Sequence, residues 1–129
     1  YAAPMQTFEP ATLDLLRRTD EVRIETSGGP GRRVHRTIIW VAVDDADRVL
    51  VRSVRGSRGR WYQRMLGNRF GAVLVDGRRI EVHAEPARDA ERVSACSAAL
   101  EAKYPSAGAT LRAMLRAEVL DTTLELHPT

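Results

Sequence analysis

The residues best suited to ligand chemistry lie in one segment, Arg52–Tyr62, with the sequence RSVRGSRGRWY. It contains four arginines, two serines and two glycines, and it ends in a tryptophan and a tyrosine. Glycines let backbone N–H groups approach an anion, and arginines donate paired hydrogen bonds to phosphate or carboxylate. The helix expected to begin at its end adds partial positive charge. The segment therefore predicts a site for an anionic, phosphate-bearing ligand.

Charged residues are segregated along the chain. The net charge is only +3, and nineteen of the twenty basic residues are arginine, with Lys103 the single lysine. From Arg48 to Val75 there are seven arginines and no acidic residue, whereas acids gather around Glu81–Glu101. This distribution favours a local anion site over a generally basic protein. The alternative interpretation is a solvated loop whose arginines keep the protein soluble, with Trp61 in the core.

The elements expected to position this segment are short strands joined by hairpins, with helices between them. Helices are predicted over 10–18, 61–66, 89–104 and about 109–116, and strands over 21–27, 34–43, 49–54, 72–75, 79–85 and 119–126. Asp76-Gly77 is a two-residue hairpin signal. Regular strand–helix–strand alternation is absent, so an α+β fold with an antiparallel barrel and peripheral helices fits better than a parallel sheet. At 129 residues and 43% hydrophobic composition, residues 1–129 are predicted to form one domain.

Arg36 is a second candidate for anion binding. It lies on the longest predicted strand, Val34–Val43, and in strict alternation it shares a face with Ile38 and Trp40. From there it could reach the anion of the neighbouring loop. Equally, it fits an arginine at the edge of the core that extends into solvent.

Other residue types give no sign of metal or nucleophilic chemistry. Three histidines, His35, His83 and His127, are dispersed over strands without metal-ligand spacing, so no metal site is expected. Cys96 lies on the apolar stripe of its predicted helix, which places it in the core. If the protein is an enzyme, its chemistry is then expected to belong to a bound cofactor.

Composition also limits location and partners. No stretch approaches the roughly 18 apolar residues of a membrane span, and Tyr1–Pro10 lacks the features of a secretory signal. With a single cysteine, these features favour a cytoplasmic protein without a membrane partner. Aromatic residues make up 5% of the chain and do not interleave with the basic ones, so nucleic-acid binding is the weakest hypothesis. The apolar run Ile38–Val43 is compatible with a homodimer.

Several stretches between Val22 and Glu85 resemble the split-barrel flavin-binding superfamily, which includes pyridoxamine-phosphate-oxidase-like and deazaflavin-dependent nitroreductase-like proteins. The resemblance is carried, in chain order, by Glu25–Gly31, Arg36-Thr37, Arg52–Gly56, Trp61-Tyr62 and Asn68. Within that superfamily the chain is most similar to an uncharacterised family of unknown function. Four features depart from the deazaflavin pattern: Ile38 and Arg69 replace prolines, Arg64 replaces an asparagine, and Gly29-Pro30-Gly31-Arg32 replaces an Arg-Lys-Ser-Gly run.

This resemblance implies a six-stranded antiparallel split β-barrel with peripheral helices. It also implies a flavin mononucleotide (FMN) or deazaflavin coenzyme and hydride transfer to or from a small organic substrate, with Tyr62 as the proton or hydrogen-bond donor. The residues predicted to bind the cofactor, from the segment and the resemblance together, are Arg36, Ser53, Val54, Arg55, Gly56, Ser57, Arg58 and Trp61. The alternative is a flavin-free split barrel that binds another anionic small molecule or catalyses a cofactor-free reaction.

Overall fold

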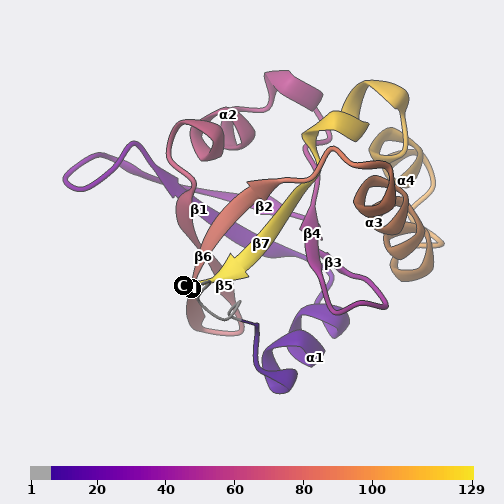
Figure 1. The fold of residues 1–129 in the computed structure, drawn as a ribbon, viewed down its shortest axis with the longest axis horizontal. Coiled ribbons are helices and arrows are strands. Elements are labelled where there is room, and N and C mark those ends of the chain that lie inside the picture. Colours follow the sequence, from indigo (N-terminus) through magenta and orange to yellow (C-terminus); the bar gives the residue numbers. More distant parts are fainter. Residues whose placement is uncertain (1–6) are drawn as a thin grey trace, which may run out of the picture.

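Hairpins dominate the architecture, which confirms the predicted α+β split-barrel class. The computed structural model describes residues 7–129; residues 1–6, part of the segment inspected for a secretory signal, lie outside the described residues. Seven antiparallel strands form one curled sheet (Figure 1). In pairing order they are β2 (Val34–Ile39), β1 (Val22–Ser27), β5 (Phe70–Val75), β6 (Arg78–Pro86), β7 (Leu124–Pro128), β4 (Val49–Val51) and β3 (Ala42–Val43).

Helices lie around this sheet. The α-helices are α1 (Pro10–Arg18), α2 (Arg60–Gly67), α3 (Ala90–Lys103) and α4 (Ala109–Met114), and two 3-10 segments are η1 (Gly56–Arg58) and η2 (Ala117–Thr122). Figure 1 shows α3 and α4 together on the β3–β4 side and α2 near β1. Within residues 7–129, none of the helices has the length and apolar character needed to cross a membrane.

The sheet has seven strands rather than six because the predicted strand Val34–Val43 is broken at Trp40 and Val41. Its first part, β2, pairs with β1 at one edge of the sheet, and its second part, β3, pairs with β4 at the other edge. The Val41 carbonyl leaves the ladder to accept hydrogen bonds from Lys103 Nζ (2.7 Å) and the Tyr104 hydroxyl (3.3 Å). One continuous segment therefore joins both edges, and the sheet curls.

Two other strands are shorter than predicted because the Thr122 hydroxyl forms hydrogen bonds with backbone groups near their ends. The strand predicted to begin at Val119 begins at Leu124, since Ala117–Thr122 forms η2. There the Thr122 hydroxyl donates to the Val119 carbonyl at 2.6 Å, which stabilises a turn instead of an extended chain. Likewise β4 ends at Val51, and the backbone N–H of Ser53 donates to Thr122 Oγ1 at 3.1 Å.

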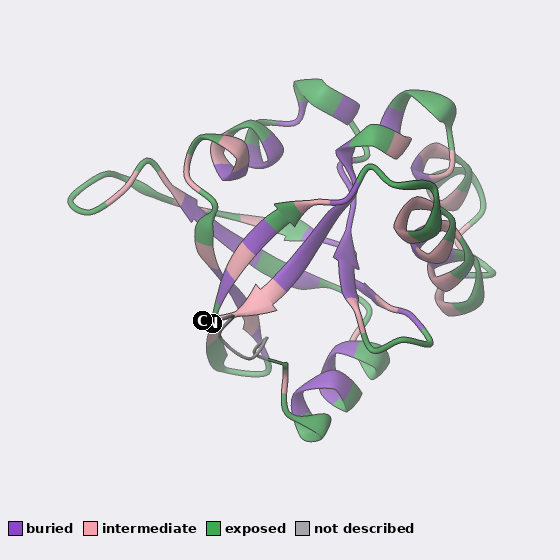
Figure 2. Cartoon of the chain, in the orientation of Figure 1, coloured by how far each residue is buried: buried purple, intermediate pink, exposed green. Residues whose placement is uncertain are grey.

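The apolar side chains form two clusters. The larger fills the inside of the curled sheet, where the buried face of α1 (Leu13, Leu15, Leu16) packs against it; the buried strands are visible in Figure 2. The smaller lies between the β3–β4 hairpin and α3–α4, and it includes Cys96, which is 0% exposed. Burial raises the pKa of the Cys96 thiol to about 11, so the predicted core position of Cys96 is confirmed.

One charged side chain fastens this helical layer to the sheet. Arg52, directly after β4, is 1% exposed. Its guanidinium donates four hydrogen bonds of 2.9–3.0 Å to acceptors on α3, α4 and the segment after η2, namely Val93 O, Ser97 Oγ, Met114 O and Thr123 Oγ1. All four acceptors are neutral, and burial lowers the pKa of Arg52. Arg52, the first residue of the segment predicted to bind an anion, is therefore an internal clamp.

We expect Arg52→Met to lower the free energy of unfolding by about 2–4 kcal/mol, because buried acceptors lose their donor while the apolar volume is kept. Hydrogen exchange should quicken in α3 and α4 before it does in β1 and β5. Urea unfolding and hydrogen exchange measure both effects, with the exposed Arg58→Met as the matched control. Equal free energies of unfolding for Arg52→Met and Arg58→Met would contradict the stabilising role of Arg52.

Candidate functional site

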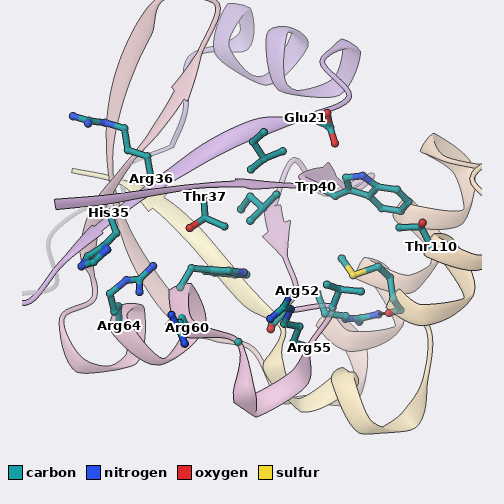
Figure 3. Close-up of a pocket in the computed structure, with 17 residues that line it drawn as sticks. Glu21, His35, Arg36, Thr37, Trp40, Arg52, Arg55, Arg60, Arg64 and Thr110 are labelled. Atoms are coloured by element: carbon teal, nitrogen blue, oxygen red, sulfur yellow. Dashed lines mark hydrogen bonds between the residues drawn. The ribbon is translucent and has the colours of Figure 1, made fainter.

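A cavity of about 580 Å³ opens between β2 and the connection from β4 to α2 (Figure 3). Its floor comes from the residues after β4 and the start of α2, and β2 lies across it. The side toward α4 is formed by Trp40, Thr110 and Met114. The lining holds five arginines, Arg36, Arg52, Arg55, Arg60 and Arg64, and a single acid, Glu21.

The cavity brings together five of the nine predicted site residues: Arg36, Ser53, Val54, Arg55 and Trp61. Three others, Gly56, Ser57 and Arg58, form the 3-10 turn η1 and are not among its lining residues. Tyr62 is 3% exposed and packs in the larger core cluster. Trp61 is 7% exposed and meets the Tyr62 ring edge-on, with 6.3 Å between centroids.

The start of α2 forms part of the cavity wall. Gly59 precedes the helix, no side chain caps its first turn, and that turn contains no acid. The first intrahelical bond near this end runs from Gln63 N to Gly59 O, at 3.0 Å. The earlier backbone N–H groups of a helix have no partner within it and carry partial positive charge. This end of α2 therefore favours an anion.

The Ser53 hydroxyl lies beside that helix end and is buried without a hydrogen-bond partner. Ser53 is 1% exposed, and its Oγ is the one such side-chain atom found in residues 7–129. A Cβ on Gly59 would come within 2.2 Å of this oxygen, so glycine is needed for the two groups to lie together. A buried hydroxyl normally has a partner. An anion at the start of α2 would supply one.

The arginines around the cavity differ in how their charge is compensated. Arg36 pairs with Glu25 at 3.2 Å, and Glu25 also pairs with Arg79 at 2.6 Å. Arg79 and then Arg36 hold the pKa of Glu25 below its usual value, against the effect of burial. In Figure 3 Arg36 points away from His35 and Thr37. The ion pairs found among residues 7–129 do not include Arg52, Arg55, Arg60 or Arg64.

Sequence reasoning missed several lining residues, and periodicity could have found some of them. Along β2, His35 and Thr37 are half-buried while Arg36 and Ile38 are exposed, so the alternate face belongs to the cavity. Arg60 and Arg64 are four residues apart on α2 and share one side of the helix. Trp40, Thr110 and Met114 come from distant segments and carried no local signal.

A second polar cluster lies on β6, β7 and α3. Glu85, Glu125 and His127 each offer an atom within 4.8 Å of the others, as metal ligands would. However, Arg92 Nη1 lies 2.6 Å from Glu85 Oε1 and 3.0 Å from Glu125 Oε1. A resident guanidinium thus already compensates both carboxylates. Burial lowers the pKa of Arg92, but its hydrogen bonds to Asp89, Glu125 and Glu85 outweigh this and raise the pKa overall. The cluster is an ion-pair network that fastens α3 to the sheet.

A curled antiparallel sheet with an anion-favouring cavity beside its open edge defines a split-barrel protein. The chain belongs to the family described as "Uncharacterized protein conserved in bacteria (DUF2255)", whose model matches residues 12–126. No curated protein matches it.

Solved structures share the fold at low sequence identity. The conserved hypothetical protein Rv2991 from Mycobacterium tuberculosis has a TM-score of 0.64 and 14% identity, over 99% of this chain and 83% of that one. The heme storage protein HutZ from Vibrio cholerae has a TM-score of 0.62 and 9% identity, over 95% and 91% of the two chains. An FAD-binding protein from Mesorhizobium loti has a TM-score of 0.55 and 16% identity, over 98% and 92%.

We expect Ser53→Ala to leave the ligand-free protein as stable as the parent or about 1 kcal/mol more stable, because it removes a buried polar atom that has no partner. Gly59→Ala should cost about 1–3 kcal/mol through the clash with that atom. In the double variant Ser53→Ala/Gly59→Ala most of this cost should disappear. Thermal and urea unfolding of the parent, the two single variants and the double variant test whether the two substitutions are coupled. Strictly additive changes in the free energy of unfolding would show that a side chain at position 59 does not clash with Ser53.

Proposed function

We propose that this cavity binds a planar, phosphate-bearing cofactor, FMN or a deazaflavin coenzyme, and that the protein is an oxidoreductase acting on a small organic substrate. The observation that carries the proposal is the unpartnered Ser53 hydroxyl against the uncapped start of α2, with Arg55 and Arg60 beside it. When bound, the flavin ring supplies the hydride chemistry.

The residues present fit such a group. A volume of about 580 Å³ lies within the range of small-molecule pockets, roughly 300–1,000 Å³. Ser53, Arg55, Arg60 and the first N–H groups of α2 would hold the phosphate. Trp40, which is half-buried and lines the cavity, offers apolar surface for the ring. Fold neighbours named as FAD-binding and heme storage proteins support a planar cofactor in a barrel of this kind.

The role of Tyr62 as proton donor stays a prediction. Its ring is packed in the core beside Trp61, so it can act on the cavity mainly by fixing the tryptophan. Tyr62→Phe, compared with the parent in turnover once a substrate is found, measures what the hydroxyl contributes.

The alternative function is binding of another anionic small molecule without a flavin. It is favoured by the burial of Trp61, which at 7% exposure has little indole surface for stacking on a ring. In that case the purified protein is colourless, and neither flavin quenches its tryptophan fluorescence.

We also propose a homodimer through β2. This strand lies at one edge of the sheet and exposes Val34 (46%) and Ile38 (62%), an unusual surface for an isolated strand edge. Sedimentation analysis should give twice the monomer mass for the parent, and Ile38→Lys should shift the protein to monomer.

We expect Arg55→Ala to weaken FMN binding by about 1.5–3 kcal/mol, the scale of a charge-assisted hydrogen bond. Riboflavin, which has the same ring and no phosphate, should be bound equally by the parent and the variant. Arg58→Ala is the matched control, because Arg58 is outside the cavity lining. Fluorescence titration of the three proteins with both ligands measures the six affinities. If both variants lose the same FMN affinity, or if Arg55→Ala also loses riboflavin affinity, the phosphate does not bind at Arg55.

A further inference from the structure

The cavity carries more positive charge than one phosphate neutralises. Arg36 is already paired with Glu25. The other four lining arginines have no acidic partner among residues 7–129, and together with Glu21 they give the lining a formal charge of +3. A phosphate monoester brings about −1.5 to −2. Roughly one positive charge is then left for a second anion.

Among these four arginines, Arg64 is the one on α2 that lies away from the proposed phosphate subsite. Arg64 is one helical turn beyond Arg60, farther from the start of α2. Its Nε donates to Thr26 Oγ1 of β1 at 2.9 Å. This bond fixes the plane of the guanidinium and uses one of its five donors, so the terminal N–H groups stay available. In Figure 3 Arg64 points up toward β2, on the side where His35 lies.

Two polar side chains of β2 face α2, which carries Arg64. His35 and Thr37 are half-buried on the same face of the strand, and Figure 3 shows both directed toward α2. Partial burial, and then the charges of Arg64 and Arg33, lower the pKa of His35. On β1, its ladder partner is the neutral Thr26. At neutral pH the imidazole is therefore uncharged and can donate one hydrogen bond.

We infer that Arg64, Thr37 and His35 form a second anion subsite, which binds the carboxylate of the substrate next to the cofactor phosphate. The inference rests on the proposed function only in assigning the first subsite, at the start of α2, to a phosphate. The planar guanidinium fork matches a carboxylate, while the threonine hydroxyl and the imidazole N–H can each donate to its oxygens. The substrate class is thus a small organic carboxylate.

Binding of a carboxylate here must affect His35. The new negative charge opposes the effects of Arg64 and Arg33, so the pKa of His35 rises in the complex. Carboxylate affinity therefore increases as the pH falls toward and through the pKa of His35 in the free protein. The complex takes up a proton in that range.

Calorimetric titration with benzoate and with inorganic phosphate tests the inference. The parent should bind both at once, with saturating phosphate weakening benzoate by less than about fivefold, as expected for two screened neighbouring anions. Arg64→Gln should weaken benzoate about tenfold or more and leave phosphate unchanged. Arg69→Gln, which removes an exposed arginine outside the cavity lining, is the control for net charge. Thr37→Val should weaken benzoate even if Arg64→Gln disturbs the fold.

The pH dependence gives an independent readout. Benzoate titrations in two buffers of different ionisation enthalpy should show proton uptake, and His35→Gln should abolish it. The inference is overturned if phosphate and benzoate exclude each other, or if Arg64→Gln and Arg69→Gln weaken benzoate equally. If benzoate binds as described but neither phosphate nor FMN binds, the subsite stands and the proposed cofactor is wrong.

Discussion

A buried guanidinium without a carboxylate partner is the constraint on which the rest of the structure depends. Arg52 joins the end of β4 to both helices of the α3–α4 layer through neutral acceptors alone. The same side chain lines the cavity, so the clamp and the ligand site are parts of one polar layer. A charge buried in this way raises the local potential, and an arriving anion relieves it. Stability of the helical layer and the positive charge of the cavity are therefore linked through one residue.

The open side of the barrel is held in a related way. Lys103 donates to three backbone carbonyls, Leu16, Thr19 and Val41, and so joins the end of α1 to the crossing between β2 and β3. Trp40, at that crossing, stacks on Tyr104 with 3.9 Å between ring centroids. The cavity begins next to this stack. Cationic side chains bonded to uncharged oxygens thus fix both borders of the cavity.

Features encoded by local chemistry could be predicted from the sequence, and features set by distant partners could not. Asp76-Gly77 gives its hairpin because both residues adopt positive φ, at 50° and 72°. The break at Val41 escaped prediction because its cause is Lys103, far along the chain. In the arginine- and glycine-rich segment Arg52–Tyr62, some of the predicted site residues line the cavity and others do not. The arginines of this segment differ in burial: Arg52 is buried, whereas Arg58 is exposed. Alternation along β2 places His35 and Thr37 on the face opposite Arg36, but only the packing of distant elements makes that face part of the cavity.

The position of β7 in the sheet has a consequence for how the chain reaches this fold. The strand comes last along the sequence and yet lies inside the sheet, between β6 and β4. Until it is in place, β2-β1-β5-β6 and β4-β3 are two separate ladders, each with an unpaired inner edge. Closing the sheet needs contacts between distant parts of the chain, which are slow to form. In that interval the two edges can pair with other chains. Docking of β7 thus joins the two ladders into one sheet. Conditions that delay this docking favour aggregation over folding.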